Sequence, residues 1–235
     1  MDQYLKETIL LNYQDESIQN LVKNRGWRYL SDKDKILNIY NFVRDEIMFG
    51  YNEDDEILAS NVIIDGQGQC NTKGILFMAL LRSVGIPCRF HGFTIDKKLQ
   101  KGAITGIWYF LAPKNIIHSW IEIFYKDAWL NIEGFILDLK YLTALQKTFE
   151  DCKTDFCGFG VSTKNFLKPE VYWNENNTYI QKEGINQDLG IFDDPDSFFR
   201  IHRQELNKIK KILYKNFVRK LMNKNVSRIR ASKVS

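Results

Sequence analysis

The feature that most restricts the fold is the most apolar helical segment of the chain, which begins just after Cys70. It spans residues 71–84 and reads NTKGILFMALLRSV. Apolar residues would lie on nearly every side of a helix drawn through this segment, so such a helix must be surrounded by protein. We therefore predict a central, buried helix with Cys70 in its first turn.

The rest of the chain has enough apolar material to enclose this helix. Of its 235 residues, 44% are apolar and 26% are charged, as is usual for a globular protein. This length suits one large domain, or one domain with an extension. The four cysteines form no Cys-x-x-Cys pair and no histidine is spaced to join them, so we expect no metal site.

Patterns on both sides of the helix predict an α+β fold with an antiparallel sheet. Residues 31–49 carry apolar residues at helical spacing. Residues 88–95 favour a strand, and residues 118–138 favour two antiparallel strands with a turn at Lys126–Asp127. Residues 151–195 show no clear period, and we expect loops and short strands there.

The C-terminal part differs from the rest in charge. From Arg200 onward there are twelve Lys or Arg and one acid, so this part carries +11, and the net charge of +4 leaves −7 on the first 199 residues. The apolar residues spaced by three or four are Leu206, Ile209, Leu213, Phe217 and Leu221. They predict one long amphipathic helix from Ser197. We expect it to pack on the acidic body and to bind neither nucleic acid nor a membrane, because these residues need burial and no nucleic-acid motif accompanies them.

Cys70 is a candidate nucleophile because of its position. The first turn of a helix favours an anion, and a thiolate there is a usable nucleophile. Gly66 and Gly68 leave the approach free of side chains, so a substrate backbone could come close. The alternative is an inert buried cysteine, which on this segment alone is the more frequent case.

A cysteine nucleophile needs a base, and the chain has three histidines. Solvation explains His202 in the basic tail, and packing explains His91 on the strand after the helix. His118 begins a strand whose antiparallel neighbour leads to Glu133. A carboxylate there would hold the imidazole through Nδ1–H and fix its tautomer. Asp138 is the alternative acid if the strand register differs.

Several motifs within about residues 36–138 combine around these residues: G-x-C before the apolar helix, then LLRSVGIPCR, HSWIEIF and WLNIE. Together they resemble the transglutaminase-like (cysteine-proteinase-like) superfamily. The resemblance implies that Cys70 is the nucleophile, His118 the base and Glu133 the orienting acid, where the family usually has Asp. Asn71 stands where animal transglutaminases have Trp, which argues against a protein-crosslinking enzyme.

The resemblance also implies the fold and the activity. It predicts a papain/transglutaminase-like α+β domain over residues 1–195, with a central helix on an antiparallel sheet and an N-terminal helical segment. Residues 196–235 would be a basic helical extension packed on the same domain. The implied function is thiol-dependent acyl transfer or hydrolysis at an amide bond of a peptide or protein, without a cofactor.

Two other functions stay open. One is a catalytically silent binding module of the same fold, and the other is a deglycosylating amidase similar to peptide-N-glycanase. Because the sequence shows neither a secretory signal nor a membrane-spanning segment, we expect a cytoplasmic protein.

Further residues are candidates for binding the oxyanion and the substrate. The Cys70 backbone N–H would meet an oxyanion, and Gln69 is the candidate for a second donor. Trp108 and Tyr109 lie in an aromatic insertion between the first strand and the hairpin, which would either line the substrate cleft or pack as a surface loop. Trp120 matches an aromatic position of the family pattern and is either a cleft residue or core packing.

Overall fold

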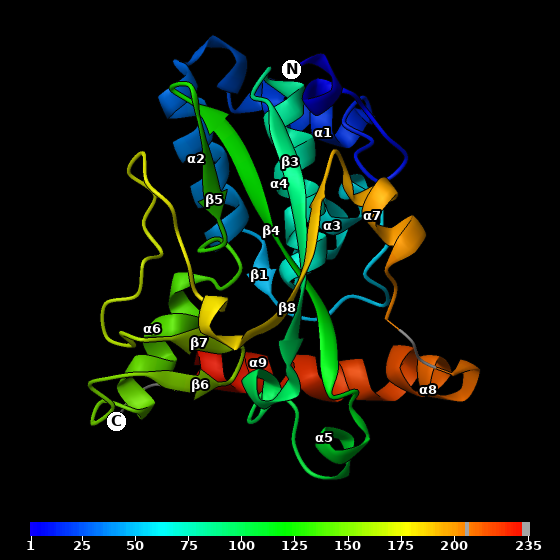
Figure 1. The fold of residues 1–235 in the computed structure, drawn as a ribbon, viewed down its shortest axis with the longest axis vertical. Coiled ribbons are helices and arrows are strands. Elements are labelled where there is room, and N and C mark those ends of the chain that lie inside the picture. Colours follow the sequence, from blue (N-terminus) through cyan, green and yellow to red (C-terminus); the bar gives the residue numbers. More distant parts are fainter. Residues whose placement is uncertain (205–206, 232–235) are drawn as a thin grey trace.

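A four-stranded antiparallel sheet and one buried helix lie at the centre of the molecule (Figure 1). The computed structural model describes residues 1–204 and 207–231. The strand order is β5-β4-β3-β8, and each neighbouring pair is antiparallel. These strands are β3 (Cys88–Asp96), β4 (Asn115–Tyr125), β5 (Ala128–Ile132) and β8 (Ile185–Phe192). The predicted fold class, a central helix on an antiparallel sheet, is confirmed.

Helices and short strand pairs surround this centre. The first helices are α1 (Glu16–Asn24), α2 (Asp32–Asp45), α3 (Ala59–Asp65), α4 (Cys70–Ser83), α5 (Ile107–Leu111) and α6 (Leu139–Thr148). The short strands are β1 (Met48–Phe49), β2 (Gln67–Gly68), β6 (Phe156–Gly158) and β7 (Val161–Thr163). Short 3-10 turns are η1 (Asp2–Leu5), η2 (Trp27–Tyr29), η3 (Lys97–Gln100) and η4 (Lys182–Gly184).

The central helix is α4, and its residues 70–82 are all buried. It packs on β4, where Gly74 allows a close approach, since a Cβ at this position would lie 3.2 Å from Cδ1 of Ile121. The helices α2 and α3 also contact α4. The apolar segment therefore forms the predicted buried helix, with Cys70 as its first residue.

The hairpin of β4 and β5 turns at the predicted position. Lys126 and Asp127 both have positive φ angles, 49° and 59°, as a two-residue turn between antiparallel strands requires. Residues 151–195 include the short strands that were predicted, but β8 was not foreseen as part of the main sheet. It is an edge strand with both faces partly or fully exposed, so it carries no apolar alternation.

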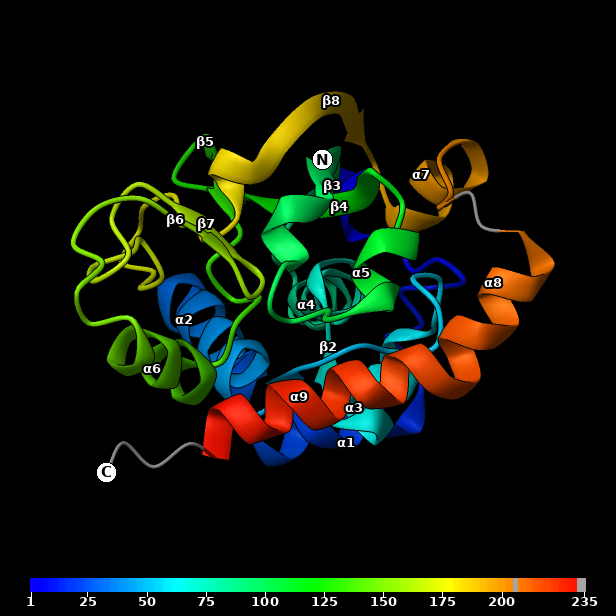
Figure 2. The same ribbon diagram turned by 90° about the horizontal axis from the view of Figure 1, so that it is seen from below.

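The prediction of one long helix from Ser197 is wrong. The chain instead forms α7 (Pro195–Ile201), α8 (Lys208–Leu213), the π-helical turn η5 (Tyr214–Val218) and α9 (Arg219–Ala231). The start of α8 is separate because the Asn207 side chain caps it, accepting a hydrogen bond from the Lys210 N–H (2.8 Å). In Figures 1 and 2, α8 to α9 run as one orange-to-red rod along the lower side of the molecule.

The apolar residues of this rod are not buried as expected. Ile209, Phe217 and Leu221 are exposed, whereas Met222 and Val226 on α9 are buried. Leu206 lies outside the described residues. Across residues 1–204 and 207–231, none of the helices combines the length and the apolar character needed to cross a membrane.

Candidate active site

Cys70 is the first residue of α4, and two closely spaced glycines precede it in the chain. Gly66 ends α3 in a left-handed conformation (φ 61°). Gly68 is packed so closely that a Cβ there would lie 2.7 Å from Oγ1 of Thr72. Cys70 is 8% exposed and is the first residue of α4. At this end of the helix, backbone N–H groups without a partner in the helix favour negative charge.

His118 and Glu133 lie close together, and both are fully buried. His118 is on β4 and Glu133 directly follows β5, whose last residue Ile132 pairs with Ile121. The His118 Nε2 atom is 2.8 Å from Oε1 of Glu133. The expectation that Nδ1 would meet the carboxylate is therefore wrong, because the ring is oriented with Nε2 toward Glu133. Within the described part of the chain, Nδ1 has no hydrogen-bond partner.

The second oxygen of Glu133 is held by backbone N–H groups. Those of Ile180, Gln181 and Lys182 donate to Oε2 at 2.8, 2.9 and 3.1 Å. A buried carboxylate needs such donors, because burial without them is costly. No pattern in the sequence indicated these three donors, since their segment has no apolar period and lies 47 to 49 residues from Glu133.

The charges around His118 favour its protonated form. Burial alone would lower the pKa of this imidazole, but the attraction of Cys70 and the hydrogen bond and charge of Glu133 outweigh it and raise the pKa well above the ordinary value. A carboxylate and a thiolate on the two sides of one imidazole both stabilise the imidazolium ion. The arrangement therefore favours a proton on His118.

Gln69 lies immediately before α4, and hydrogen bonds fix its amide. Its Oε1 accepts from the Asn52 N–H (2.9 Å), and its Nε2 donates to Asp55 Oδ1 (3.1 Å). Asn71 also donates to Asp55 (3.0 Å) and accepts from the Ser119 hydroxyl (2.8 Å). Asn71 thus links β4 to the loop that holds Asp55.

Asp55 is a residue of this site that the sequence did not single out. Burial raises its pKa, and the hydrogen bonds from Asn71 and Gln69 oppose that rise. It lies in the acidic stretch GYNEDDE, residues 50–56, which predicts only a loop. Nothing in such a run of acids indicates which one turns toward the helix end.

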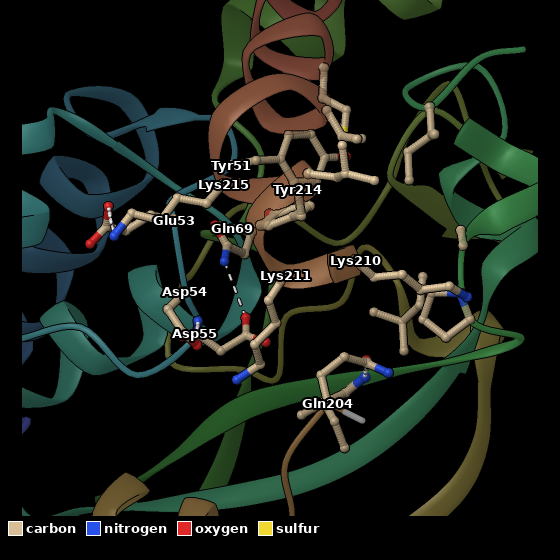
Figure 3. Close-up of a pocket in the computed structure, with 18 of the residues that line it drawn as sticks. Tyr51, Glu53, Asp54, Asp55, Gln69, Gln204, Lys210, Lys211, Tyr214 and Lys215 are labelled. Atoms are coloured by element: carbon tan, nitrogen blue, oxygen red, sulfur yellow. Dashed lines mark hydrogen bonds and ion pairs between the residues drawn. The ribbon is translucent and has the colours of Figure 1, made fainter. Parts of the chain in front are cut away.

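A pocket of about 360 Å³ opens beside Cys70 (Figure 3). Its lining includes residues 53–56 of the acidic loop, Ile117 of β4, Trp108 of α5 and Tyr214 of η5. Figure 3 draws Tyr214 and its neighbours on the C-terminal rod together with Gln69 and Asp55. The basic C-terminal segment therefore forms one wall of the pocket next to the thiol.

The three aromatic cleft candidates lie in different places. Trp108 lines the pocket as described, whereas Tyr109 and Trp120 do not. The Tyr109 ring lies 5.2 Å from the Lys97 ammonium. Trp120 is buried on β4 with its ring 4.2 Å from that of Phe93 on β3, so it packs within the sheet as the alternative interpretation expected.

Asp138, the alternative acid, has another position and other partners. It caps α6 by accepting from the Tyr141 N–H (2.9 Å) and pairs with the Arg230 guanidinium (2.7 Å). The acid that contacts His118 is thus Glu133. In the described ranges, no group of three or more His, Cys, Asp or Glu is placed to hold a metal ion.

Comparison with known proteins identifies the family of this site. Residues 22–134 match the family model of the transglutaminase-like superfamily. This part of the chain, which contains Cys70, His118 and Glu133, belongs to that superfamily, and the resemblance is confirmed.

A solved structure is also similar, the "Putative Cysteine Protease" of Cytophaga hutchinsonii, at 12% identity and a TM-score of 0.47. The alignment covers 82% of this chain and 47% of that one, so the present chain spans about half of its length. No curated protein matches the sequence.

Proposed function

We propose that this protein is a thiol-dependent enzyme that cleaves an amide bond or transfers its acyl group. Cys70 is the nucleophile, His118 moves the proton and Glu133 orients His118. The observation that carries the proposal is the buried His118–Glu133 hydrogen bond of 2.8 Å. The other ring nitrogen, Nδ1, has no hydrogen-bond partner among the described residues, and Cys70 contributes to the raised pKa of His118. Both observations support Cys70 as the third residue of a catalytic triad.

The reaction follows from these groups. The Cys70 sulfur attacks the amide carbonyl carbon after its proton has passed to His118, and a tetrahedral oxyanion forms. The C–N bond then breaks, and the leaving amine takes the proton from His118, which leaves a thioester on Cys70. Water or a second amine attacks this thioester and regenerates the thiol.

The oxyanion needs donors at the N-terminal end of α4. The Cys70 backbone N–H is one of the first N–H groups of the helix, which have no partner within it. Gln69 remains the candidate for the second donor, since its amide carries two hydrogens and one hydrogen bond joins it to Asp55. Each such donor contributes about 3 kcal/mol to transition-state stabilisation in other enzymes.

The first experiment measures the alkylation of Cys70 by iodoacetamide from pH 5.5 to 9.5 in the wild type and in His118→Ala. Because the raised pKa of His118 keeps its ring cationic near neutral pH, we expect fast alkylation at pH 6–7 in the wild type. In the variant this reaction should be lost, and the rate should rise only near about pH 8.5, where ordinary thiols ionise.

The same chain supplies an internal reference for this measurement. Cys157 is an exposed free cysteine on β6, and mass spectrometry of the digested protein separates its modification from that of Cys70. Its rate should be equal in both proteins. If Cys70 reacts more slowly than Cys157 at pH 6.5 and does not respond to His118→Ala, the protein is a silent binding module and the proposal fails.

A further inference from the structure

The pocket beside Cys70 has mainly apolar walls that come from three parts of the chain. The sheet supplies Ile117, the segment between β3 and β4 supplies Ile104 and Trp108, and α9 supplies Met222. A volume of about 360 Å³ lies within the range of pockets that bind small organic groups. The Cys70 side chain lies in the same lining, so a group bound here would be next to the sulfur.

Two buried polar side chains of the lining, Gln100 and Gln69, form hydrogen bonds to protein groups. The Gln100 Oε1 atom accepts from the Tyr51 hydroxyl at 2.5 Å. The Gln69 amide is fixed at both ends, by the Asn52 N–H and by Asp55. Because these groups have partners, the bound group does not have to supply polar atoms to satisfy them.

Charges at the outer side of the pocket are paired across it. Lys215 lies 2.9 Å from Glu53, an ion pair drawn in Figure 3, and Arg203 lies 2.9 Å from Glu56. The first pair joins the C-terminal rod to the acidic loop, and the second joins the segment after α7 to the same loop. Both reduce the charge that a ligand would meet. Lys210 and Lys211 of α8 also belong to the lining, so a charged end of a ligand would lie with them and its apolar part with Ile117 and Met222.

The wall formed by the C-terminal rod is fixed to the opposite side of the pocket. Asn223 bonds both backbone groups of Tyr51, accepting from its N–H (2.7 Å) and donating to its carbonyl (3.0 Å). Asn225 donates to the carbonyls of Gly102 and Ala103 at 2.7 and 3.1 Å. Hydrogen bonds therefore connect the two sides of the pocket and fix their relative position.

We infer that this pocket binds an apolar acyl group, the part of the substrate whose carbonyl carbon Cys70 attacks. This inference rests on the proposed function and adds the substrate class to it. The acyl group stays on the sulfur as a thioester while the amine leaves, so a semi-enclosed pocket beside the sulfur suits the group that remains bound. Its source is either a fatty acyl chain or an apolar aminoacyl residue, which share this chemistry.

The test measures binding without chemistry. Isothermal titration calorimetry on Cys70→Ala compares N-decanoylglycine, N-acetyl-leucine methylamide and N-acetylglycine. Each buried methylene strengthens binding by about fourfold, so at least one of the first two probes should bind at least about tenfold more tightly than N-acetylglycine. The tighter of the two identifies the source of the acyl group. Equal binding of all three, or no binding, overturns the inference.

Matched variants in the same helix locate the binding. Leu213 of α8 lines the pocket and Ile209 of α8 is exposed outside it. In the Cys70→Ala background, Leu213→Glu should weaken binding of the apolar probe at least about tenfold, while Ile209→Glu leaves it unchanged. Trp108→Ala gives a second test from the opposite wall and should also weaken binding. Unchanged binding in both pocket variants contradicts the inference.

These results are separate from a failure of the proposed function. A Cys70 thiol that does not respond to His118→Ala ends the proposed chemistry, whether or not Cys70→Ala binds acyl groups. A reactive thiol together with no preference for apolar probes ends only the substrate assignment.

Discussion

At the scale of single residues, two fully buried ionisable side chains, one beside α4 and one on it, are stabilised in different ways. Glu133 keeps partners for both carboxylate oxygens, through His118 and through three backbone N–H groups. Lys73, one turn after Cys70, donates to the carbonyls of Arg44 and Ile136 at 3.1 and 3.0 Å. Burial lowers the pKa of Lys73 to about 7.

Glu133→Gln tests the role of the carboxylate at this scale. The glutamine keeps an oxygen for the His118 ring but removes the negative charge that helps to raise the pKa of His118. The alkylation rate of Cys70 at pH 6.5 should therefore fall to a value between those of the wild type and His118→Ala. Asp138→Asn is the control and should leave this rate unchanged, because Asp138 caps α6 and pairs with Arg230.

Lys73→Met tests the cost of the buried amine. The folded state loses the Lys73 proton near pH 7 and the unfolded state only near 10.5, so in this window the unfolded chain binds more protons. The contribution of Lys73 to the free energy of unfolding therefore rises with pH, by up to about 1.4 kcal/mol per unit. Urea denaturation of both proteins from pH 7 to 10 should show the wild type gaining stability relative to Lys73→Met. A constant difference would contradict this assignment.

At the scale of elements, the contact between β3 and α7 depends on one glycine. Gly92 lies between Ser119 of β4 and Gly190 of β8 in the sheet, and the Phe198 ring of α7 covers it. α7 is held there by its N-cap, since Asp194 accepts from the Ser197 N–H (2.7 Å). The aromatic ring can reach the sheet backbone only because position 92 has no side chain.

Gly92→Ala should destabilise the protein by about 1–3 kcal/mol through overpacking. A Cβ at this position would lie 2.1 Å from Cε2 of Phe198, so the ring or the strand must move. The double variant Gly92→Ala/Phe198→Leu, compared with each single variant, should recover part of the loss. Chemical denaturation measures all four proteins, and additive effects would show that the two positions do not interact.

At the scale of the whole molecule, side chains near the C-terminal end join distant parts of the chain. Arg230 binds the Asp138 carboxylate and the Phe49 carbonyl, both at 2.7 Å. Asp138 in turn accepts from the Phe49 N–H at 2.9 Å. The C-terminal rod is thereby tied to β1 and α6, and it covers the pocket from that anchored end.

Arg230→Met should lower the free energy of unfolding at pH 7 by about 3–5 kcal/mol, because it leaves Asp138 buried without its cation. The pKa of Asp138 is lowered in the folded state, so this stabilisation is present above pH 3.8 and is lost as the pH falls through the folded pKa. Urea denaturation should show the difference from the wild type shrinking toward pH 3. Lys224→Met, at an exposed position of α9, should change stability little.

The features that the sequence predicted are those set by neighbours along the chain. The apolar segment after Cys70 forms a buried helix because no other placement removes all its sides from water. The turn at Lys126–Asp127 returns the chain along β4, so Glu133, one residue past the last pair Ile121–Ile132, reaches the side chain of His118 without facing it in the ladder. The catalytic role of these residues stays a prediction until the alkylation experiment.

Tertiary structure alone decided the features that depend on distant parts of the chain. No local sequence pattern predicts the three backbone donors to Glu133, the hydrogen bonds of Asp55 or the contribution of Met222 to the pocket wall. The tail also divided into separate helices and left Phe217 exposed, although its spacing predicted burial. Periodicity records which faces of an element are apolar. Which segment covers each face, and which polar group meets a buried charge, is settled only when all elements pack together.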